Sequence, residues 1–274
     1  MAELARLSLN LATTRVKWGA LDAIEGCARA GIHWLAPWRD QLAAAGLENC
    51  VRAIRDAGLG VSSLCRGGMF PAPDRAGREA AVEDNRRAVD EAAALGARAL
   101  VLVAGGLPAG SKDLAGARAM VADGIAALLP YARAAGVALA LEPLHPMYAA
   151  DRACINTLAQ ALDLCEALGP GLGVAVDVYH VWWDPDLDAG IARAGRDRLA
   201  GFHVSDWLVP TRDLLLDRGM MGDGVIELAR IREKMDAAGY DGPIEVEIFS
   251  AENWWRRAPD EVVAIAKERF RNAV

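Results

Sequence analysis

The chain has 274 residues, of which 53% are hydrophobic, and carries a formal net charge of −7. This length and apolar content suit one large α/β domain, so we expect a single domain over residues 1–274. The acidic balance argues against nucleic acid as a partner, because phosphate backbones are bound by clustered Lys and Arg. No segment resembles a signal peptide or approaches membrane-spanning length, so we expect a soluble, cytoplasmic protein without a membrane partner.

Short apolar runs alternate with longer amphipathic segments along the chain. The pattern predicts strands at residues 6–11, 31–36, 59–64, 98–104, 137–142, 172–177, 200–205 and 243–249. It predicts helices at residues 19–30, 45–57, 76–96, 113–135, 156–168, 186–196, 224–239 and 258–273. Glycine stands after most of these helices and before the next strand, as in a left-handed helix cap.

The predicted strands are apolar throughout, which is typical of parallel sheets buried on both faces. Eight strand–helix units, with no GxGxxG after the first strand, favour a closed (β/α)8 TIM barrel over an open doubly wound sheet. The longest predicted loop, residues 206–223, follows the seventh strand, and we expect it to lie over the site. A second long segment, residues 65–75, is predicted to form part of the opposite wall.

Four predicted strands in the second half of the chain end in side chains that can bind a metal: Glu142, Asp177, His203 and Glu247. The carboxyl ends of parallel barrel strands share one rim, where the active sites of such barrels are built. Oxygen and imidazole donors suit one divalent ion such as Mn, Mg, Co or Zn. A single carboxylate of this kind is more often part of a salt bridge, but Asp, Glu and His are disfavoured in buried parallel strands unless paired.

The segments LEPLHP, VDVYHVWWD, GFHVSDW, DRGMMGDGVIEL and GYDGPIEVEIF resemble the xylose-isomerase-like barrel superfamily of sugar isomerases and epimerases. Its members include ketose 3-epimerases, hydroxypyruvate isomerase, inosose isomerases and dehydratases, and apurinic endonucleases. The resemblance covers essentially the whole chain. It implies that the same four residues bind the metal and that Glu142 and Glu247 are the acid/base pair. It also implies that His180 and Arg218 contact the substrate.

The chain departs from the ketose 3-epimerases at one position. Those enzymes carry a further substrate-contacting glutamate six residues beyond the first metal ligand, and Tyr148 stands there in this chain. Three other residues are candidates for substrate binding, and each has a structural alternative. His145 and Trp38 could pack in the core, and Asp206 could cap a helix or turn instead of orienting a ligand.

The predicted chemistry is proton transfer through a metal-bound enediolate. Removal of a proton by one glutamate and its return by the other inverts a carbon, whereas return to the former carbonyl carbon isomerises the substrate. The sequence therefore predicts a metal-dependent isomerase or epimerase of a small sugar, inosose or keto-acid. The alternatives are a metal-dependent dehydratase or lyase and, from another class, a non-catalytic sugar-binding barrel. The histidine count, four in all, and the acidic net charge both argue against an apurinic endonuclease.

Two further expectations concern the ligand and the assembly. No clear glycine-rich phosphate cradle is present, and the nearest approach is CRGG at residues 65–68, so we expect an unphosphorylated substrate. The tryptophan content, eight residues in all, is consistent with a homodimer as well as with ligand contacts.

Overall fold

The computed structural model describes residues 2–274 and has the architecture of a parallel barrel. Its larger sheet runs in the order β3-β2-β1-β11-β8-β7-β6-β5-β4. The terminal strands of this order, β3 and β4, are successive pieces of one strand interrupted at residues 62–63, so the sheet closes on itself. The strands are β1 Leu7–Asn10, β2 Trp34–Ala36, β3 Gly60–Val61, β4 Leu64–Gly68, β5 Ala99–Val103, β6 Ala138–Glu142, β7 Leu172–Asp177, β8 Leu199–Val204 and β11 Ile244–Val246. The predicted (β/α)8 barrel is confirmed.

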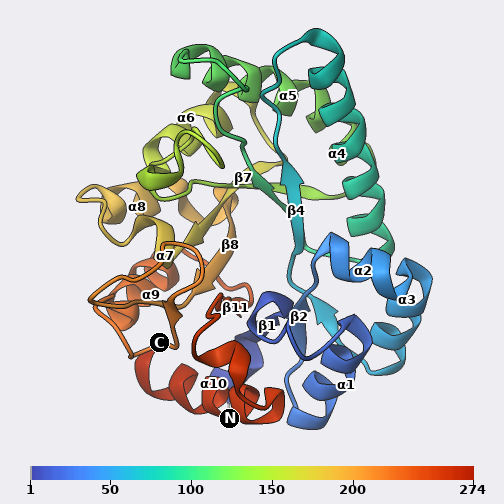
Figure 1. The fold of residues 1–274 in the computed structure, drawn as a ribbon, viewed down its shortest axis with the longest axis vertical. Helices are drawn as coiled ribbons and strands as arrows, with labels where there is room; N and C mark the ends of the chain where they lie inside the picture. The colour runs from blue at the N-terminus through green and yellow to red at the C-terminus, as the bar shows by residue number, and fades with distance from the viewer. Residues whose placement is uncertain (1) are drawn as a thin grey trace.

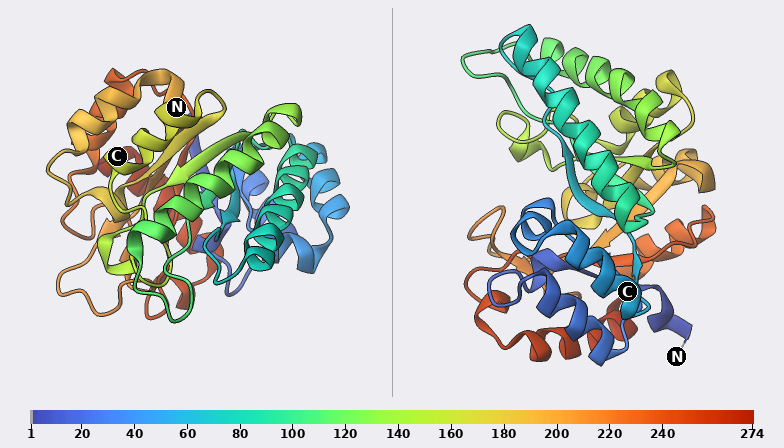
Figure 2. Two further views of the ribbon diagram at one scale, coloured as in Figure 1. Left: turned by 90° about the horizontal axis from the view of Figure 1, so that it is seen from above. Right: turned by 90° about the vertical axis from the view of Figure 1, so that its right-hand side faces the viewer.

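Helices form an outer layer around these strands, and both chain termini lie at the same end of the molecule (Figures 1 and 2). Short 3-10 turns at residues 2–6, 11–13, 146–148 and 254–256 supplement this layer. The α-helices are α1 Ala20–Ala30, α2 Arg39–Ala45, α3 Leu47–Asp56, α4 Arg75–Leu95, α5 Leu114–Ala134, α6 Leu158–Leu168, α7 Val178–Val181, α8 Leu187–Arg198, α9 Leu228–Ala237 and α10 Pro259–Ala273.

Local capping explains why several helices begin and end where the sequence predicts. Asp74, Asp113 and Thr157 precede α4, α5 and α6, and each side chain accepts a hydrogen bond from a backbone N–H of the first turn. Gly31 and Gly96 end α1 and α4 with φ values of 66° and 63°. Because side chains disfavour this left-handed conformation, glycine suits both positions.

The third predicted strand, residues 59–64, differs from the structure. It is broken in two, and residues 65–68, expected in a loop, belong to β4. Glycine usually argues against a strand, yet the barrel needs both glycines of β4. A Cβ at Gly67 would lie 2.4 Å from Asn85 Oδ1, and one at Gly68 would lie 1.9 Å from the Val103 carbonyl oxygen. Close packing of β4 against α4 and β5 therefore overrides the local signal.

Two other segments also differ from the prediction. The helix expected at residues 45–57 corresponds to α3, and a further helix that was not predicted, α2, precedes it and ends at Gly46, which has a φ of 84°. The loop expected at residues 206–223 contains a short antiparallel pair, β9 (Asp206–Trp207) and β10 (Arg218–Gly219). Side-chain contacts with residues far away in the sequence stabilise this pair, so the local sequence does not predict it.

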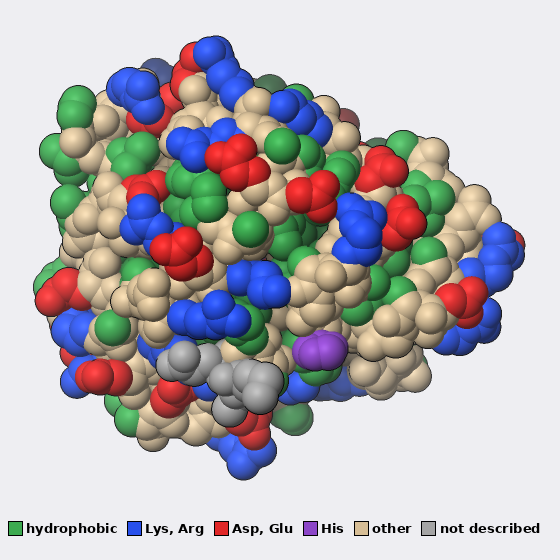
Figure 3. Space-filling model, turned by 90° about the horizontal axis from the view of Figure 1, so that it is seen from below, with side chains coloured by type: hydrophobic (Ala, Val, Ile, Leu, Met, Phe, Trp, Pro, Cys, Tyr) green, Lys and Arg blue, Asp and Glu red, His purple; other side chains and the backbone are tan. Residues whose placement is uncertain are grey.

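The main hydrophobic core lies between the strands and the helices, and a smaller cluster is made of Ala99, Ala140 and Ala175. The five cysteines are buried and unpaired. Within residues 2–274, no helix is both long enough and apolar enough to span a membrane. On the face drawn in Figure 3, basic and acidic side chains are interspersed with apolar ones.

Candidate metal centre and substrate cavity

Four side chains that can bind a divalent ion converge at the carboxyl end of the barrel. Glu142 ends β6, Asp177 ends β7, His203 lies near the end of β8, and Glu247 directly follows β11. One potential ligand atom from each side chain lies within 4.8 Å of the others. The register of the parallel strands explains the convergence, because Asp177 pairs with His203 and β11 pairs with the other side of β8.

Small residues lie beneath these side chains in the barrel. Side chains alternate between the two faces of a strand, so Ala140 shares a face with Glu142, and Ala175 with Asp177. Both alanines are fully buried. The small residues leave room for the larger polar side chains above them to meet at the centre of the barrel mouth.

The polar atoms of the cluster fit a divalent ion. Glu142 Oε1 and His203 Nδ1 lie 3.0 Å apart, but both are buried and neither makes a hydrogen bond within the described residues. Buried polar atoms without a partner are rare. Two ligands in neighbouring positions of a six-coordinate ion, with bonds of about 2.1 Å, lie about 3 Å apart. A metal ion would therefore satisfy atoms that the protein leaves unpaired.

Glu245 lies behind this cluster and was missed in the sequence analysis. Its Oε2 is 3.4 Å from His203 Nε2 and accepts a hydrogen bond of 3.2 Å from Asn10. A carboxylate near the second nitrogen of a metal-binding histidine commonly orients the ring. The alternation in the segment IEVE was the available signal, because it places Glu245 and Glu247 on the same face of the strand.

Arg218 of β10 is buried at the edge of the cluster. Its Nη1 donates hydrogen bonds to Asp177 Oδ2 at 2.9 Å and to Glu247 Oε2 at 3.1 Å. Its Nη2 lies 3.1 Å from His180 Nε2, and its guanidinium stacks over Tyr179, with Cζ 4.4 Å from the ring centroid. The loop that was predicted to cover the site thus delivers a cation to the acidic side chains.

Burial and neighbouring charges change the pKa values in the cluster. Burial raises the pKa of Glu247 to about 8, although Arg218 and His203 oppose the rise. Burial lowers the pKa of His180 to about 3, so its ring is neutral near pH 7. Burial alone would lower the pKa of His203, but the three surrounding glutamates raise it well above its usual value. Burial tends to raise the pKa of Asp177, but Arg218 and two histidines lower it overall.

A cavity of about 370 Å³ opens over the cluster, a size that accommodates a small molecule. Glu142, Glu247, His180 and Arg218 form part of its wall. Trp38 lines the cavity as well and donates from Nε1 to Asn10 Oδ1 at 2.8 Å. The structure therefore brings Trp38 close to the cluster although the two are far apart in the sequence.

Two candidate substrate contacts lie elsewhere. Asp206 accepts hydrogen bonds from the backbone N–H groups of Trp207, Gly222, Gly224 and Ile226, so its carboxylate organises the loop. The structural alternative thus describes Asp206 better than substrate binding does. His145 stacks on Trp207, with ring centroids 5.1 Å apart, and is not part of the cavity wall.

Tyr148 is a cavity residue that the sequence analysis treated only as a departure from the epimerases. Its side chain lines the cavity, and its hydroxyl is buried without a hydrogen-bond partner in the part of the chain that the structure describes. Its ring meets His180 edge to face, with centroids 5.8 Å apart. A buried hydroxyl usually finds a partner, so this one is suited to contact a bound ligand.

The fold and the site together define the class of protein: the chain belongs to the xylose isomerase-like TIM barrel family, with the match extending over residues 19–268. Protein SMc04130 from Sinorhizobium meliloti 1021 is 64% identical in its crystal structure, with a TM-score of 0.97 and 98% of each chain covered. The crystal structure of IOLI protein with a binding zinc atom shares the fold at 19% identity, with a TM-score of 0.86 over 98% of each chain. The L-ribulose-5-phosphate 3-epimerase UlaE of Escherichia coli is 28% identical over 226 residues, which are 80% of this chain and 73% of UlaE.

Proposed function

We propose that the protein is a divalent-metal-dependent isomerase or epimerase of a small sugar or related keto compound. The observation that carries this proposal is that Glu142 and Glu247 belong to one potential metal-binding cluster and also line the cavity above it. Two carboxylates beside one metal site suit proton removal and return next to a carbonyl group. The similarity to UlaE, an L-ribulose-5-phosphate 3-epimerase, supports the same class of reaction.

Glu142, Asp177, His203 and Glu247 would hold the ion. A divalent ion there supplies Lewis acidity, which makes a C–H group beside a substrate carbonyl easier to deprotonate. The IOLI protein of similar fold binds zinc, and the four side chains offer oxygen and nitrogen donors. Both observations support zinc or a similar divalent ion. Glu245 would orient His203 from behind.

Glu142 and Glu247 reach the cavity from β6 and β11, with β7 and β8 between them in the sheet. One carboxylate can therefore take a proton from one side of a bound sugar while the other returns a proton from another side. Arg218 donates to Glu247 Oε2 and holds that carboxylate in place. This arrangement supports epimerisation, and return of the proton by the same carboxylate supports isomerisation.

His180 is placed to bind a substrate oxygen. Arginine has only donors, so the contact with Arg218 Nη2 makes His180 Nε2 the acceptor and leaves the proton on Nδ1. His180 Nδ1 is buried and has no partner within residues 2–274. The neutral ring can therefore donate one hydrogen bond to a hydroxyl or carbonyl oxygen of the substrate.

A dehydratase is the second candidate, and Tyr148 is the observation that favours it. Burial raises the pKa of its hydroxyl, which keeps it protonated, and the resemblance to ketose 3-epimerases leads us to expect a glutamate at this position. A neutral phenol lining the cavity can donate a proton to a departing hydroxyl group, whereas an ionised glutamate cannot.

Incubation in D2O with a panel of ketoses and inososes, in the presence of Mn²⁺ or Zn²⁺, tests the proposal. An isomerase or epimerase incorporates deuterium at carbon and yields a product of otherwise unchanged composition. A dehydratase yields a product lighter by one water. Binding of a sugar without deuterium exchange or product would contradict the proposal and favour a non-catalytic sugar-binding barrel.

A further inference from the structure

Two arginines on the cavity wall have no acidic partner. Arg66 and Arg152 both line the cavity, yet within residues 2–274 no carboxylate oxygen lies within 4.0 Å of either guanidinium. The other two arginines of the same wall are paired, Arg15 with Asp40, and Arg218 with Asp177 and Glu247. Arg66 and Arg152 are therefore the cations of this wall that remain available to a ligand.

The two unpaired arginines also affect each other. Arg66 is half-buried, and burial together with the positive charge of Arg152 lowers its pKa. Arg152 lies over the ring of Tyr148, with its Cζ 5.5 Å from the ring centroid. Like charges in a partly desolvated cavity repel each other, and an anion between them would remove this repulsion.

The strand order places Arg66 across the barrel mouth from His203, while β6, which ends in Glu142, is two strands away. Arg66 lies on β4, and β4 is separated from β8, which carries His203, by β5, β6 and β7 on one side of the ring. On the other side the intervening positions are held by β2, β1 and β11, so β4 and β8 face each other. Because Arg66, Glu142 and Glu247 line the same cavity, one bound molecule can contact both the metal centre and Arg66.

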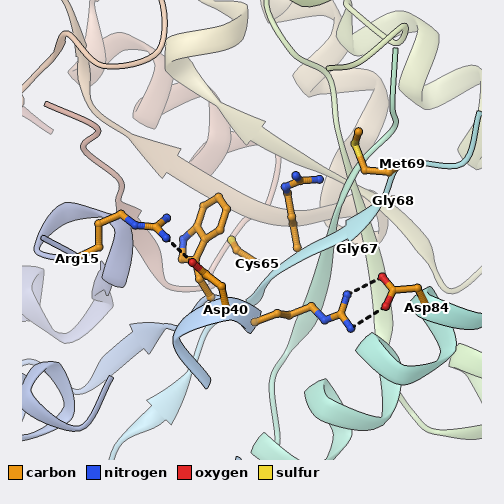
Figure 4. A pocket seen from close by; sticks show the side chains of 10 residues that line it. Arg15, Asp40, Cys65, Gly67, Gly68, Met69 and Asp84 are labelled. Atoms are coloured by element: carbon orange, nitrogen blue, oxygen red, sulfur yellow. Dashed lines mark hydrogen bonds and ion pairs between the residues drawn. The ribbon is translucent and has the colours of Figure 1, made fainter. Parts of the chain in front are cut away.

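Arg66 also borders a second hollow of about 440 Å³, which shares Arg15, Trp38 and Met69 with the cavity. Figure 4 shows this hollow with Arg15 and Asp40 on one side and Gly68, Met69 and Asp84 on the other. The bonds within it engage Arg15 with Asp40, and Arg39 with Asp84. Arg66 lies where the two hollows meet, and its guanidinium donates no hydrogen bond to any residue that the structure describes.

In the CRGG segment the backbone groups of Gly68 are already hydrogen-bonded within the fold. Asn85 accepts from Gly68 N–H at 2.6 Å and donates to the Gly68 carbonyl at 2.8 Å, so the fold itself uses these groups. The expectation of an unphosphorylated substrate depended on the absence of such a cradle. Arginine side chains bind phosphate and carboxylate groups through paired hydrogen bonds and need no glycine-rich loop.

The remaining charges of the cavity wall also bear on the ligand. Glu142 and Glu247 belong to the potential metal-binding cluster, and Asp151 is the other acidic side chain that lines the cavity. A divalent ion at the cluster would offset the negative charge there and leave Arg66 and Arg152 to attract an anionic group.

We propose that Arg66 and Arg152 form a subsite for an anionic group, a phosphate or a carboxylate, carried by the sugar substrate that occupies the cavity over the metal centre. The inference rests on the proposed function, because it concerns a substrate that reacts at Glu142 and Glu247. It narrows the substrate class to sugar phosphates and sugar acids.

Calorimetric titration of the metal-loaded protein with inorganic phosphate, and separately with acetate, tests the subsite. Arg66→Met and Arg152→Met each weaken anion binding about tenfold or more, because each removes charge-assisted hydrogen bonds. Arg55→Met, at a largely exposed arginine on α3, removes the same charge and leaves the affinity unchanged. Arg152 is exposed, so its variant is expected to fold even if the Arg66 variant does not.

The anion that binds more tightly indicates whether the substrate is a sugar phosphate or a sugar acid. Equal affinity in the wild type and both cavity variants, or no binding of either anion to the wild type, would overturn the inference. Metal content and deuterium exchange are measured on the same preparations. Anion binding without metal or exchange would refute the proposed function alone, and metal with exchange but without anion binding would refute the subsite alone.

Discussion

The two halves of the barrel mouth deliver their polar side chains in different ways. The half built by β6, β7, β8 and β11 places Glu142, Asp177, His203 and Glu247 at or next to the ends of strands. The half built by β1 to β5 reaches the cavity through Arg15 and Trp38, which lie outside the regular strands, and through Arg66 on the irregular strand β4.

This difference suggests that different parts of the barrel mouth carry out the reaction and recognise the substrate. Side chains on hydrogen-bonded strands hold fixed relative positions, which proton transfer and metal binding require. Side chains on loops and irregular strands vary more readily between relatives without disturbing the sheet. We therefore expect the strand-end side chains of the later half to determine the type of reaction. Arg66 of the earlier half, together with loop residues such as Arg152, would determine which substrate reacts.

The largest expected effect falls in the later half. Glu247→Gln removes one member of the acid/base pair, and we expect turnover to fall about a thousandfold, within the usual contribution of such a group. Steady-state assays with the substrate found in the panel measure this. Glu252→Gln, at an exposed glutamate paired with Arg256, is the matched control. Wild-type turnover in the Glu247 variant would show that Glu247 takes no part in the proton transfer.

Arg218→Met should have the next largest effect. The substitution leaves Asp177 and Glu247 buried without their shared cation, which we expect to lower the free energy of unfolding by about 3 kcal/mol in metal-free protein. Urea denaturation measures the loss. Arg256→Met, at an exposed ion pair, should change stability by less than about 1 kcal/mol. Equal stability of the two variants would show that Arg218 is not needed to balance the buried carboxylates.

The pH dependence of stability sharpens the comparison further. In the native metal-free protein the pKa of Glu247 is raised to about 8 from 4.5, and that of His203 is raised well above 6.5. Between pH 6.5 and 8 the native state therefore holds more protons than the unfolded state at Glu247, and the raised pKa of His203 acts in the same direction. Stability should therefore fall as pH rises, by about 2 kcal/mol from Glu247 alone.

Urea denaturation of metal-free protein at pH 6.5 and pH 8 measures this fall. The lowered pKa of His180, about 3, acts in the opposite direction but only below pH 6.5, outside this window. Glu247→Gln should show a smaller fall, because the titrating group is gone. A stability that rises between the two pH values would contradict the assigned protonation of the cluster.

The smallest expected effect concerns Glu245. Glu245→Gln keeps the shape of the side chain but weakens its interaction with His203, so we expect metal affinity to fall about tenfold. Competition with a chromogenic chelator measures the affinity. Glu79→Gln, at an exposed glutamate on α4, is the control. An unchanged affinity would mean that the backbone alone orients His203.

Much of the fold and the four potential ligands could be predicted from the sequence because their signals are local. Apolar runs, helix periodicity and glycines such as Gly31 and Gly96 depend on neighbouring residues. Glu142 and Asp177 stand at the ends of such runs, and the barrel geometry then brings strand ends together. The potential metal ligands on the later half of the barrel mouth could be predicted from the sequence for this reason.

The rest depends on contacts between segments far apart in the sequence. The use of Gly67 and Gly68 inside a strand follows from packing against Asn85 and Val103. The role of Asp206 follows from amides 16 to 20 residues away. No local pattern marks Arg66 as a cavity residue, because its orientation is known only when the strand is placed.

The metal content of the native protein, beside that of the Glu142→Gln/Glu247→Gln double variant, tests the central claim most directly. Both proteins are purified by gel filtration, checked for folding by circular dichroism, and analysed for metals. The account predicts about one divalent ion per native chain and its loss from the folded double variant. Equal metal in both proteins, or none in the native protein after incubation with Mn²⁺ or Zn²⁺, would contradict it.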